Sequence, residues 1–444
     1  MSSNGRTPEF GSGYHGSNPC VPAIKNMKKD LAVIILAAGK GERMKSSLPK
    51  VLHNICGRPM LAYLLDLAAS LKPKKTVVVV GFEHKQVCAV LPEKIATAVQ
   101  RRLVGSADAV KEAMRKLPGF RGTVLVLYGD TPLLKKESVD KLLKYHLENG
   151  LAATLLIAQP EKPAGYGRIL RDKLFGICGI VEEKDADDFE KEIKEVNTGI
   201  ICFDKAALEA VLKKIRPDNR KKEYYLTDAV RILYAQGKLV DGVKIADAQE
   251  AMGVNSRLEL ARANSLMQER VNAKLMLDGV SIVDSRLTFI SYGSKIGRDS
   301  VIYPFTVIER DVKIGKRCCI GPFAHLREGT RVSDGTTLGN FVETVRSRIG
   351  AKVFAKHFSY LGDASVGRGA NIGAGTVVAN FNGRSKNHTV IKDNAMIGSD
   401  TILVAPIKVG RGAVTGAGAV VLRDIPDHQK AVGVPARILK EKGR

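Results

Sequence analysis

The sequence predicts two folded regions of different class. The first is an α/β domain with a doubly wound, Rossmann-like sheet, and the second is a left-handed parallel β-helix; one long helix connects them. In the first half, short apolar runs alternate with stretches of helical spacing, as in doubly wound sheets. In the second half, aliphatic residues recur at steps of six, as in hexapeptide β-helices. The 444 residues are enough for two or three domains with full cores.

The composition argues against a membrane or nucleic-acid partner. No apolar run approaches the roughly 18 residues of a membrane helix, and the first residues lack the apolar core of a signal peptide, so we expect a cytoplasmic protein. The net charge of +24 keeps nucleic-acid binding open as an alternative. The densest basic clusters, at 72–75 and 220–222, are short and have no interleaved aromatic residues, which favours a solvated basic surface.

Two further features bound the fold. Residues 1–26 are small and polar without periodicity, so we expect a leader or tail outside the fold and Met27 as the natural start. The seven cysteines form no C-x-x-C pair and have no histidine spacing that suits zinc. Most of them lie in apolar contexts, which predicts reduced thiols.

Strand–helix alternation defines the predicted α/β domain. Predicted strands cover 32–36, 76–80 and 123–128, and another ends at Gln100. Predicted helices cover 60–71, 83–91 and 107–116. Ligands of a doubly wound sheet bind at the carboxyl ends of its strands, so the loops after these strands are candidate sites.

A glycine-bearing loop follows the first strand. Gly39 and Gly41 have no Cβ, so backbone N–H groups can come close to an anion. Arg43 and Lys50 add two cations, and together these residues predict a cradle for a triphosphate. A G-x-G alone is more often just a tight turn, and this loop is neither a Walker motif nor a complete G-x-G-x-x-G.

An acidic residue ends a later strand, in the run Tyr128-Gly129-Asp130. A carboxylate at this edge of the sheet can hold Mg²⁺ against phosphate oxygens. It can equally be the N-cap of a helix, because Thr131-Pro132 follows. The residues alone leave both interpretations open.

The whole string from Leu36 to His53 carries a family resemblance. It reads L-A-A-G-K-G-E-R-M and then L-P-K-V-L-H, which resembles the signature of sugar-1-phosphate nucleotidyltransferases. The likeness is greatest to the bifunctional N-acetylglucosamine-1-phosphate uridyltransferase/glucosamine-1-phosphate acetyltransferase family and extends over nearly all of the chain from Met27. It implies transfer of a uridylyl group from UTP to N-acetylglucosamine-1-phosphate, giving pyrophosphate and UDP-N-acetylglucosamine, a cell-wall precursor.

The resemblance also assigns residues to this first reaction. Arg43 and Lys50 correspond to the catalytic cations, and Asp130 with Asn255 corresponds to the Mg²⁺ site. Gln100 and the Gly105-Ser106 pair correspond to the uracil-reading positions. The full set of implied nucleotide and sugar contacts is Leu36, Ala37, Ala38, Gly39, Lys50, Gln100, Gly105, Ser106, Tyr128, Gly129, Asp130, Gly167, Glu182, Asn197 and Asn255.

One departure from the family pattern stands out in this half. The family usually has G-T-G-H-A where this chain has Gly105-Ser106-Ala107-Asp108-Ala109. Serine keeps the hydroxyl of threonine, but Asp108 places a negative charge near the nucleotide. The preference for UTP is therefore less certain than the phosphate chemistry.

A helix is expected between the two halves. Residues 256–278 place Leu258, Leu266, Leu275 and Leu277 among charged residues, which predicts an amphipathic helix that packs its apolar stripe on the flanking domains. The predicted boundaries are 27–255 for the nucleotidyltransferase domain, 256–280 for the connecting helix, 281–426 for the β-helix and 427–444 for a C-terminal tail.

The period of six is the strongest structural signal in the sequence. One aliphatic side chain per short strand points inward in a hexapeptide β-helix, and small residues turn the corners. The predicted inward positions are Ile296, Ile302, Ile308, Ile314, Ile320, Leu326, Val332 and Leu338, then Ile349, Ala355 and Leu361, then Val366, Ile372 and Val378, and finally Ile391, Ile397, Leu403 and Val409. Residues 379–389 interrupt the period, which predicts a loop extruded from one corner.

The same family resemblance assigns an acetyltransferase site to the β-helix. A lone histidine is more often a surface or structural residue, but His357 corresponds to the base that deprotonates the glucosamine amine as it attacks acetyl-CoA. Family members are trimers with acyl-donor grooves between subunits, which implies a homotrimer. The implied contacts are Arg327 and Tyr360 for the sugar phosphate, Asn371 for the sugar, Ala374 N–H for the oxyanion, and Asn380, Phe381, Ser399 and Ala417 for acetyl-CoA.

The second half departs further from the family pattern. Val345 stands where the family usually has lysine, with Arg346 next to it, and Phe381 replaces a tyrosine. Two alternatives therefore stay open: a monofunctional sugar-1-phosphate nucleotidyltransferase with a structural β-helix, and a non-catalytic scaffold like the regulatory subunits of a translation-initiation exchange factor. The phosphate-handling set of Arg43, Lys50, Asp130 and Asn255 argues against the scaffold.

Overall fold

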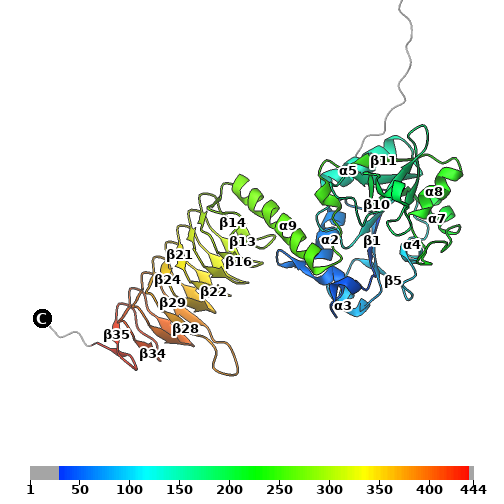
Figure 1. The fold of residues 1–444 in the computed structure, drawn as a ribbon. Helices are drawn as coiled ribbons and strands as arrows, with labels where there is room; N and C mark the ends of the chain where they lie inside the picture. The colour runs from blue at the N-terminus through cyan, green and yellow to red at the C-terminus, as the bar shows by residue number, and fades with distance from the viewer. Residues whose placement is uncertain (1–29, 440–444) are drawn as a thin grey trace, which may run out of the picture.

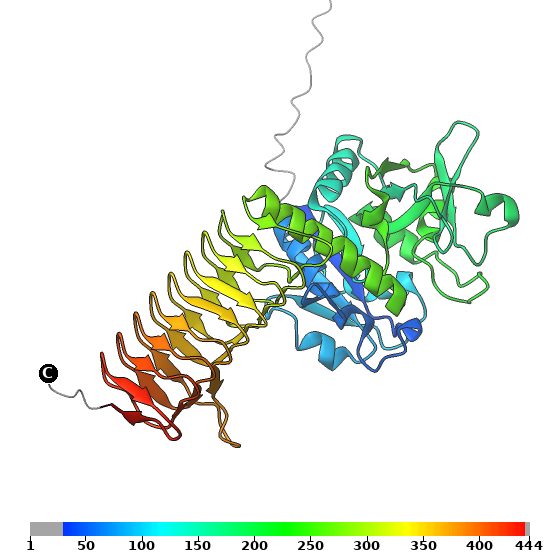
Figure 2. The ribbon, with the colours of Figure 1, turned by 60° about the vertical axis from the view of Figure 1, so that its left-hand side comes forward.

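The computed structural model of the protein describes residues 30–439. An α/β domain forms one end of the molecule and a long β-helix the other, and helix α9 (Arg257–Leu277) lies between them (Figures 1 and 2). The predicted leader at 1–26, the predicted start at Met27, Cys20 and positions 440–444 of the predicted tail lie outside the described residues. The six described cysteines are all free thiols.

The α/β domain is built on a twisted sheet with β1 near its centre, and its main path runs β11-β7-β10-β6-β1-β4-β5. The strands β1, β4, β5 and β6 are parallel, as the strand–helix alternation predicts, whereas β10 runs antiparallel to both β6 and β7. The strands of this path are β1 (Leu31–Ala37), β4 (Lys75–Val80), β5 (Ala96–Val99), β6 (Thr123–Tyr128), β7 (Ala153–Ala158), β10 (Val196–Asp204) and β11 (Val240–Lys244). Beside this path, β8 (Arg168–Arg171) and β9 (Ile177–Val181) belong to the same sheet. The strands β2 (Asn54–Ile55) and β3 (Arg58–Pro59) form a separate two-stranded sheet.

Helices cover both faces of this sheet, so each face forms its own apolar core. Ala32 and Ile34 of β1 face α4, α7 and α8, while Val33 and Ile35 face α2 and α5. A strand covered on both faces has no polar alternation, which explains its continuous apolar sequence. The helices are α2 (Met60–Ser70), α3 (His84–Cys88), α4 (Ser106–Met114), α5 (Lys136–Glu148), α6 (Asp188–Lys191), α7 (Lys205–Leu212) and α8 (Asp228–Ala235), with short 3-10 turns at Glu42–Met44, Lys50–Leu52 and Ala248–Ala251.

The C-terminal half is the predicted β-helix, whose described strands form three parallel sheets. The first sheet contains β12 (Ser281–Ile282), β15 (Val301–Ile302), β18 (Cys319–Ile320), β21 (Thr337–Asn340), β24 (Phe354–His357), β27 (Asn371–Ile372), β30 (Met396–Ile397), β33 (Val414–Thr415), β35 (Lys430–Val432) and the antiparallel β36 (Arg437–Ile438). The second contains β13 (Phe289–Ile290), β16 (Val307–Ile308), β19 (His325–Leu326), β22 (Glu343–Val345), β25 (Tyr360–Gly362), β28 (Val377–Ala379), β31 (Ile402–Val404) and β34 (Val420–Val421). The third contains β14 (Lys295–Ile296), β17 (Lys313–Ile314), β20 (Arg331–Val332), β23 (Arg348–Ile349), β26 (Ala364–Val366), β29 (Thr389–Ile391) and β32 (Ile407–Val409).

The period of six sets the core of this β-helix. Every predicted inward aliphatic residue is buried, and equivalent residues pair between successive coils, for example Ile302 with Ile320 and Ile320 with Leu338. Each buried aliphatic side chain contributes about 2 kcal/mol from the area removed from water. The predicted interruption is also present, because residues 380–388 form a loop that extends from the corner between β28 and β29 (Figures 1 and 2).

Helix α9 begins where the sequence predicts, with the Ser256 side chain accepting a hydrogen bond from Glu259 N. The predicted apolar stripe is wrong in part, because Leu258 and Leu277 are 82% and 89% exposed. The buried face instead carries two amides. Asn272 Nδ2 donates to the carbonyls of Ser285 and Thr288, and Gln268 Nε2 donates to the Ile290 carbonyl. These amides satisfy carbonyls of the first coils, which have no preceding coil to pair with.

Candidate active sites

The glycine loop after β1 has the conformation that a phosphate cradle needs. Gly41 has φ +66°, and a Cβ there would lie 2.7 Å from Lys50 Cβ, so only glycine fits against the lysine stem. A Cβ on Gly39 would have no protein atom within 4 Å, so this side of the loop is open to a ligand. Met44 is buried and anchors the loop, whereas Arg43 is exposed at its mouth.

Lys50 brings together two residues that are far apart in the sequence. Its Nζ donates to Asp130 Oδ2 and, at 2.8 Å, to Asn255 Oδ1. The Lys50 and Asp130 side chains are 13% and 16% exposed, so solvent screens this pair only partly. Asp130 is thus placed in the site by its position at the end of β6, and the structure brings it beside Asn255 as the sequence predicts.

The same two oxygens fit a hard divalent cation. A carboxylate and an amide oxygen that already share one ammonium ion present two oxygen donors to a single point, which suits Mg²⁺ with phosphate oxygens and water as its other ligands. Backbone contacts hold the pair in register, since Val254 N donates to the Asp130 carbonyl and Asn255 N donates to Glu259 Oε2. Among the described residues, no cluster of three or more histidine, cysteine or acidic side chains offers a different metal site.

The predicted base-reading residues also lie together. Gln100 is 5% exposed, and its Nε2 donates to the Gly105 carbonyl at 3.0 Å and to Asp108 Oδ2 at 2.9 Å. Gly105 has φ +126°, and a Cβ there would lie 2.4 Å from the Tyr224 carbonyl oxygen. Ser106 Oγ accepts from Leu226 N, which ties this loop to the segment before α8.

A third group gathers the predicted sugar contacts. Asn197 N donates to the Gly167 carbonyl, and a Cβ on Gly167 would lie 3.4 Å from Glu182 Oε2, so all three residues border one space. Thr227 Oγ1 donates to Glu182 Oε1 at 3.0 Å. Burial raises the pKa of the Glu182 carboxyl above its usual range. The Tyr128 ring packs against Gly199 at the edge of this group. Burial also raises the pKa of the Tyr128 hydroxyl.

On the β-helix, His357 ends β24 and faces Asn340 of the neighbouring strand. The distance from His357 Nδ1 to Asn340 Oδ1 is 3.0 Å. An amide oxygen accepts only, so this contact favours the tautomer with the proton on Nδ1, which leaves Nε2 for a substrate. The imidazole is exposed, as a base must be to reach a substrate.

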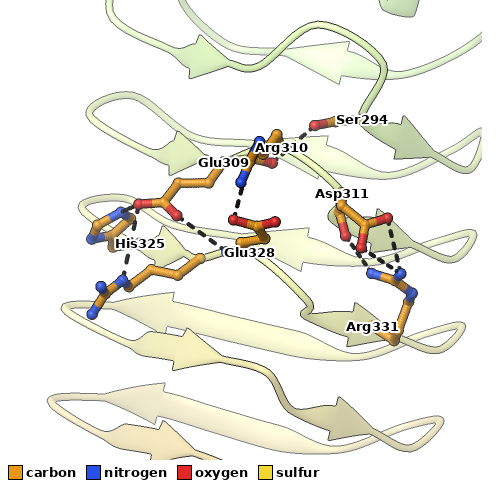
Figure 3. Close-up of polar contacts among 8 residues, drawn as sticks. Ser294, Glu309, Arg310, Asp311, His325, Glu328 and Arg331 are labelled. Atoms are coloured by element: carbon orange, nitrogen blue, oxygen red, sulfur yellow. Dashed lines mark hydrogen bonds and ion pairs between the residues drawn. The ribbon is translucent and has the colours of Figure 1, made fainter. Parts of the chain in front are cut away.

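Acidic side chains hold Arg327 on the second sheet. Arg327 Nη1 donates to Glu343 Oε1 at 2.9 Å, and its Nε lies 3.9 Å from Glu309 Oε1. Glu309 is itself positioned by His325 at 3.0 Å and by the backbone N–H of Glu328 (Figure 3). The hydrogen bond to Glu343 raises the pKa of the guanidinium, which stays charged.

A further group surrounds Tyr360 on the same sheet. A Cβ on Gly362 would lie 2.5 Å from the Tyr360 hydroxyl and 2.7 Å from Asn380 Nδ2, so both polar groups lie over this glycine. Asn380 donates to Asp363, which also accepts two hydrogen bonds from Arg346 at 2.6 and 2.7 Å. These donors hold the pKa of the Asp363 carboxyl below its usual range, with Arg346 the main cause.

Most of the remaining residues predicted to contact the sugar, the oxyanion and acetyl-CoA lie in or near the turns that follow the strands of the first sheet. A Cβ on Gly373 would lie 2.5 Å from Ser399 N, and one on Gly398 would lie 2.7 Å from Ala417 N, so Ala374, Ser399 and Ala417 occupy equivalent places on successive coils. Asn371 is exposed on β27, and Phe381 is exposed on the extruded loop. The residues predicted for acetyl transfer therefore form two groups on adjoining faces, joined by the short turn from His357 to Tyr360.

Comparison with known proteins decides the family. A MobA-like NTP transferase domain model matches residues 33–192, and a bacterial transferase hexapeptide (six repeats) model matches 293–328 and 388–423. The bifunctional protein GlmU of Geobacillus sp. (strain WCH70) is 40% identical over 92% of this chain and 96% of its own length. Its counterparts in Pelotomaculum thermopropionicum and Carboxydothermus hydrogenoformans are 44% identical over 85% of this chain and 90% of their length, and 41% over 92% and 98%.

The chain belongs to the GlmU family. Membership confirms the predicted family, the predicted fold class and the predicted enzyme class. The protein is a bifunctional transferase with a nucleotidyltransferase domain and a hexapeptide acyltransferase domain. In the part of the chain that the structure describes, no helix combines the length and the apolar character needed to cross a bilayer.

The structure adds residues to both GlmU-type sites that the sequence reasoning did not identify. Thr227 positions Glu182, Glu259 positions Asn255, and Asp363 links Arg346 to Asn380. Thr227 lies in the run Tyr224-Tyr225-Leu226-Thr227-Asp228, directly before the start of α8. For Glu259 the capping pattern after Ser256 was a usable signal, whereas the role of Asp363 depends on pairing between coils.

Proposed function

We propose that this protein makes UDP-N-acetylglucosamine in two steps, acetylation of glucosamine-1-phosphate by acetyl-CoA and then uridylyl transfer from UTP. The observation that carries the proposal is the contact of the Lys50 ammonium with both Asp130 and Asn255. A buried cation between two oxygens at the carboxyl end of a central strand is suited to phosphate chemistry. A structural role alone does not require an open glycine loop beside it.

The first site carries out an in-line displacement in this proposal. An oxygen of the sugar-1-phosphate attacks the α-phosphorus of UTP, the bond to the bridging oxygen breaks, and pyrophosphate leaves. Arg43 and Lys50 orient the phosphates and neutralise their charge, which this reaction needs more than a proton acceptor. Asp130 and Asn255 would hold Mg²⁺, which supplies further charge neutralisation at phosphate oxygens. Gly167, Glu182 and Asn197 bind the sugar.

The second site transfers an acetyl group. His357 Nε2 takes the proton from the glucosamine amine as the nitrogen attacks the thioester carbonyl, and the coenzyme leaves as a thiol. Ala374 N–H faces the oxyanion, while Arg327 and Tyr360 bind the sugar phosphate. The sugar contacts Asn371, and acetyl-CoA binds along Asn380, Phe381, Ser399 and Ala417.

The open geometry of the second site supports a homotrimer. The two groups of site residues lie on adjoining outer faces of one β-helix, so a neighbouring copy is needed to close a groove over them. We assign the nucleotidyltransferase domain to residues 27–255, the connecting helix to 256–280, the acetyltransferase domain to 281–426 and the tail to 427–444. Strand β35 of this tail still pairs with β33 of the β-helix. Substrates are small molecules without nucleic acid or membrane, and we place the enzyme in the cytoplasm, where UTP and acetyl-CoA are made.

Two assays on the full chain test the proposal. Pyrophosphate release is measured with UTP and N-acetylglucosamine-1-phosphate, and free thiol release with acetyl-CoA and glucosamine-1-phosphate. We expect both products, the first only with Mg²⁺ present and the second without it. Glucose-1-phosphate with UTP is the control for a related nucleotidyltransferase. Faster pyrophosphate release with that control would contradict the sugar assignment, and absence of thiol release would remove the acetyltransferase half.

A further inference from the structure

The amide of Gln100 can adopt only one orientation in this structure. Its Nε2 lies 3.0 Å from the Gly105 carbonyl oxygen and 2.9 Å from Asp108 Oδ2. A carbonyl and an ionised carboxylate both accept hydrogen bonds and cannot donate. The nitrogen end of the amide must therefore face both oxygens, because the hydrogen-bond partners decide the orientation of an amide whose two ends have nearly the same shape.

This arrangement uses both N–H groups of Gln100 and leaves its oxygen for a ligand. The Gln100 side chain is buried, and its amide oxygen has no hydrogen-bond partner anywhere in residues 30–439. Asp108 can fix this orientation of the Gln100 amide, because it lies in the first turn of α4, where the helix N-terminus stabilises a negative charge. Gly105 supplies one acceptor and Asp108 the second.

We propose that Asp108 is the positioning residue for nucleobase selection: by holding Gln100 Nε2, it keeps the amide oxygen toward the base. Read at N3 of a pyrimidine, an acceptor pairs with the N–H of uracil or thymine and opposes the lone pair of cytosine. The inference rests on the proposed function, in which Gln100 reads the base. It makes Asp108, a departure from the family pattern in the first turn of α4, a determinant of UTP preference.

A purely structural role for Asp108 makes a different prediction. An acidic residue in the first turn of a helix stabilises that helix whatever the ligand. Loss of that interaction alone lowers stability and leaves the choice between two pyrimidines unchanged. The ratio of UTP to CTP use therefore separates the two roles.

The test measures kcat/KM for UTP and CTP in uridylyl transfer by the full chain. In Asp108→Asn, the amide oxygen can still accept from Gln100, so we expect the UTP-to-CTP ratio to stay within about twofold of wild type. In Asp108→Ala it falls about tenfold, and in Asp108→Lys, which offers a donor to Gln100, it falls further as CTP use rises. The change appears in KM rather than kcat, because the base does not react.

Controls separate this inference from the proposed function. Glu137→Lys changes an exposed acid in the first turn of α5 and should leave the ratio unchanged. Equilibrium binding of UTP and CTP is measured on the same variants, so a chain without transferase activity would contradict the proposed function while base selection is still read out. An unchanged ratio in folded Asp108→Lys, or an equal loss in Asp108→Asn and Asp108→Ala, would overturn the role assigned to Asp108.

Discussion

The two candidate sites of this chain are assembled in different ways. In the α/β domain, Lys50, Asp130 and Asn255 come from three distant parts of the sequence and meet through one ammonium group. On the β-helix, His357 and its partner Asn340 are 17 residues apart, and so are Arg346 and Asp363. The α/β fold thus closes a site within one chain, whereas the β-helix displays its residues on outer faces.

The difference follows from how each fold makes contacts. A doubly wound sheet brings the carboxyl ends of many strands to one edge, where their loops surround a ligand. Each coil of a solenoid contacts only its neighbours, so polar residues line up along the axis and nothing from the same chain folds over them. Changes in one site should therefore leave the other intact, and the variants Lys50→Ala and His357→Ala test that independence.

The largest effect is expected from Lys50→Ala. In the proposed mechanism the Lys50 ammonium neutralises the phosphates, so pyrophosphate release should fall by about 10³-fold or more without it. Acetyl transfer should stay within twofold of wild type, because no β-helix residue contacts Lys50 among the described contacts. Both rates are measured on the same preparation. Lys74→Ala, an exposed lysine at the other end of the sheet, is the control; retention of most activity in Lys50→Ala would refute the assignment of the first site.

The corresponding variant in the second site is His357→Ala. Removal of a general base lowers acetyl transfer by about 10²-fold or more, and uridylyl transfer should not change. Thiol release and pyrophosphate release are the two readouts. His428→Ala changes another exposed histidine of the β-helix and should affect neither rate. Equal losses in the two histidine variants would show that His357 acts through the fold rather than through the reaction.

A smaller and more graded effect is expected in the glycine loop. Gly41→Ala forces a side chain into positive φ and against the Lys50 stem, so uridylyl transfer should fall about tenfold with a lower melting temperature. Gly39→Ala meets no protein atom and should keep its melting temperature, while its KM for UTP rises. An unchanged KM in Gly39→Ala would show that the phosphates do not approach this loop.

The smallest effect is a pH-dependent change in stability at Asp363→Asn. Arg346 and Asn380 lower the pKa of Asp363 in the folded state. The ionised carboxyl therefore stabilises the protein at pH values above the ordinary aspartate pKa of 3.8, and this contribution disappears as the pH falls through the lower pKa of the folded state. The variant should therefore be less stable than wild type at pH 7, and the difference should shrink below about pH 4. Urea midpoints between pH 3 and pH 7 measure it. Asp299→Asn, which removes an exposed carboxylate on another coil, is measured beside it as the control.

Much of the fold could be predicted because local patterns repeat. Every aliphatic position that the six-residue period predicted from Ile296 to Val409 is buried, since one side chain per strand must fill a narrow core, whereas the inward Thr344 was missed because it is polar. The strand–helix alternation located β1, β4 and β6 for a similar reason. The antiparallel direction of β10 could not be predicted, because strand direction depends on which neighbours pair and not on the composition of the strand.

Helix α9 shows where pattern reading fails. Its leucines suggested one apolar stripe, yet Leu258 and Leu277 are exposed and Gln268 and Asn272 are buried. The helix packs on two different partners, with Ala263 and Met267 in the α/β core and Leu275 in the β-helix core, so no single face is buried along its length. The amides are buried because they meet open carbonyls at the start of the solenoid, which only the packed structure reveals.

The sequence by itself determined the two fold classes and the family, because these depend on periodicity and on short motifs, and it proposed the chemistry-bearing residues. Only the tertiary structure decided which of those residues touch. It shows that the Lys50 ammonium contacts Asp130 and Asn255 and that Gln100 donates to Asp108. It also shows that Asp363 accepts from both Arg346 and Asn380. The physical reason is that hydrogen bonds and ion pairs act over about 3 Å, and residues 80 to 205 positions apart reach that distance only when the chain is folded.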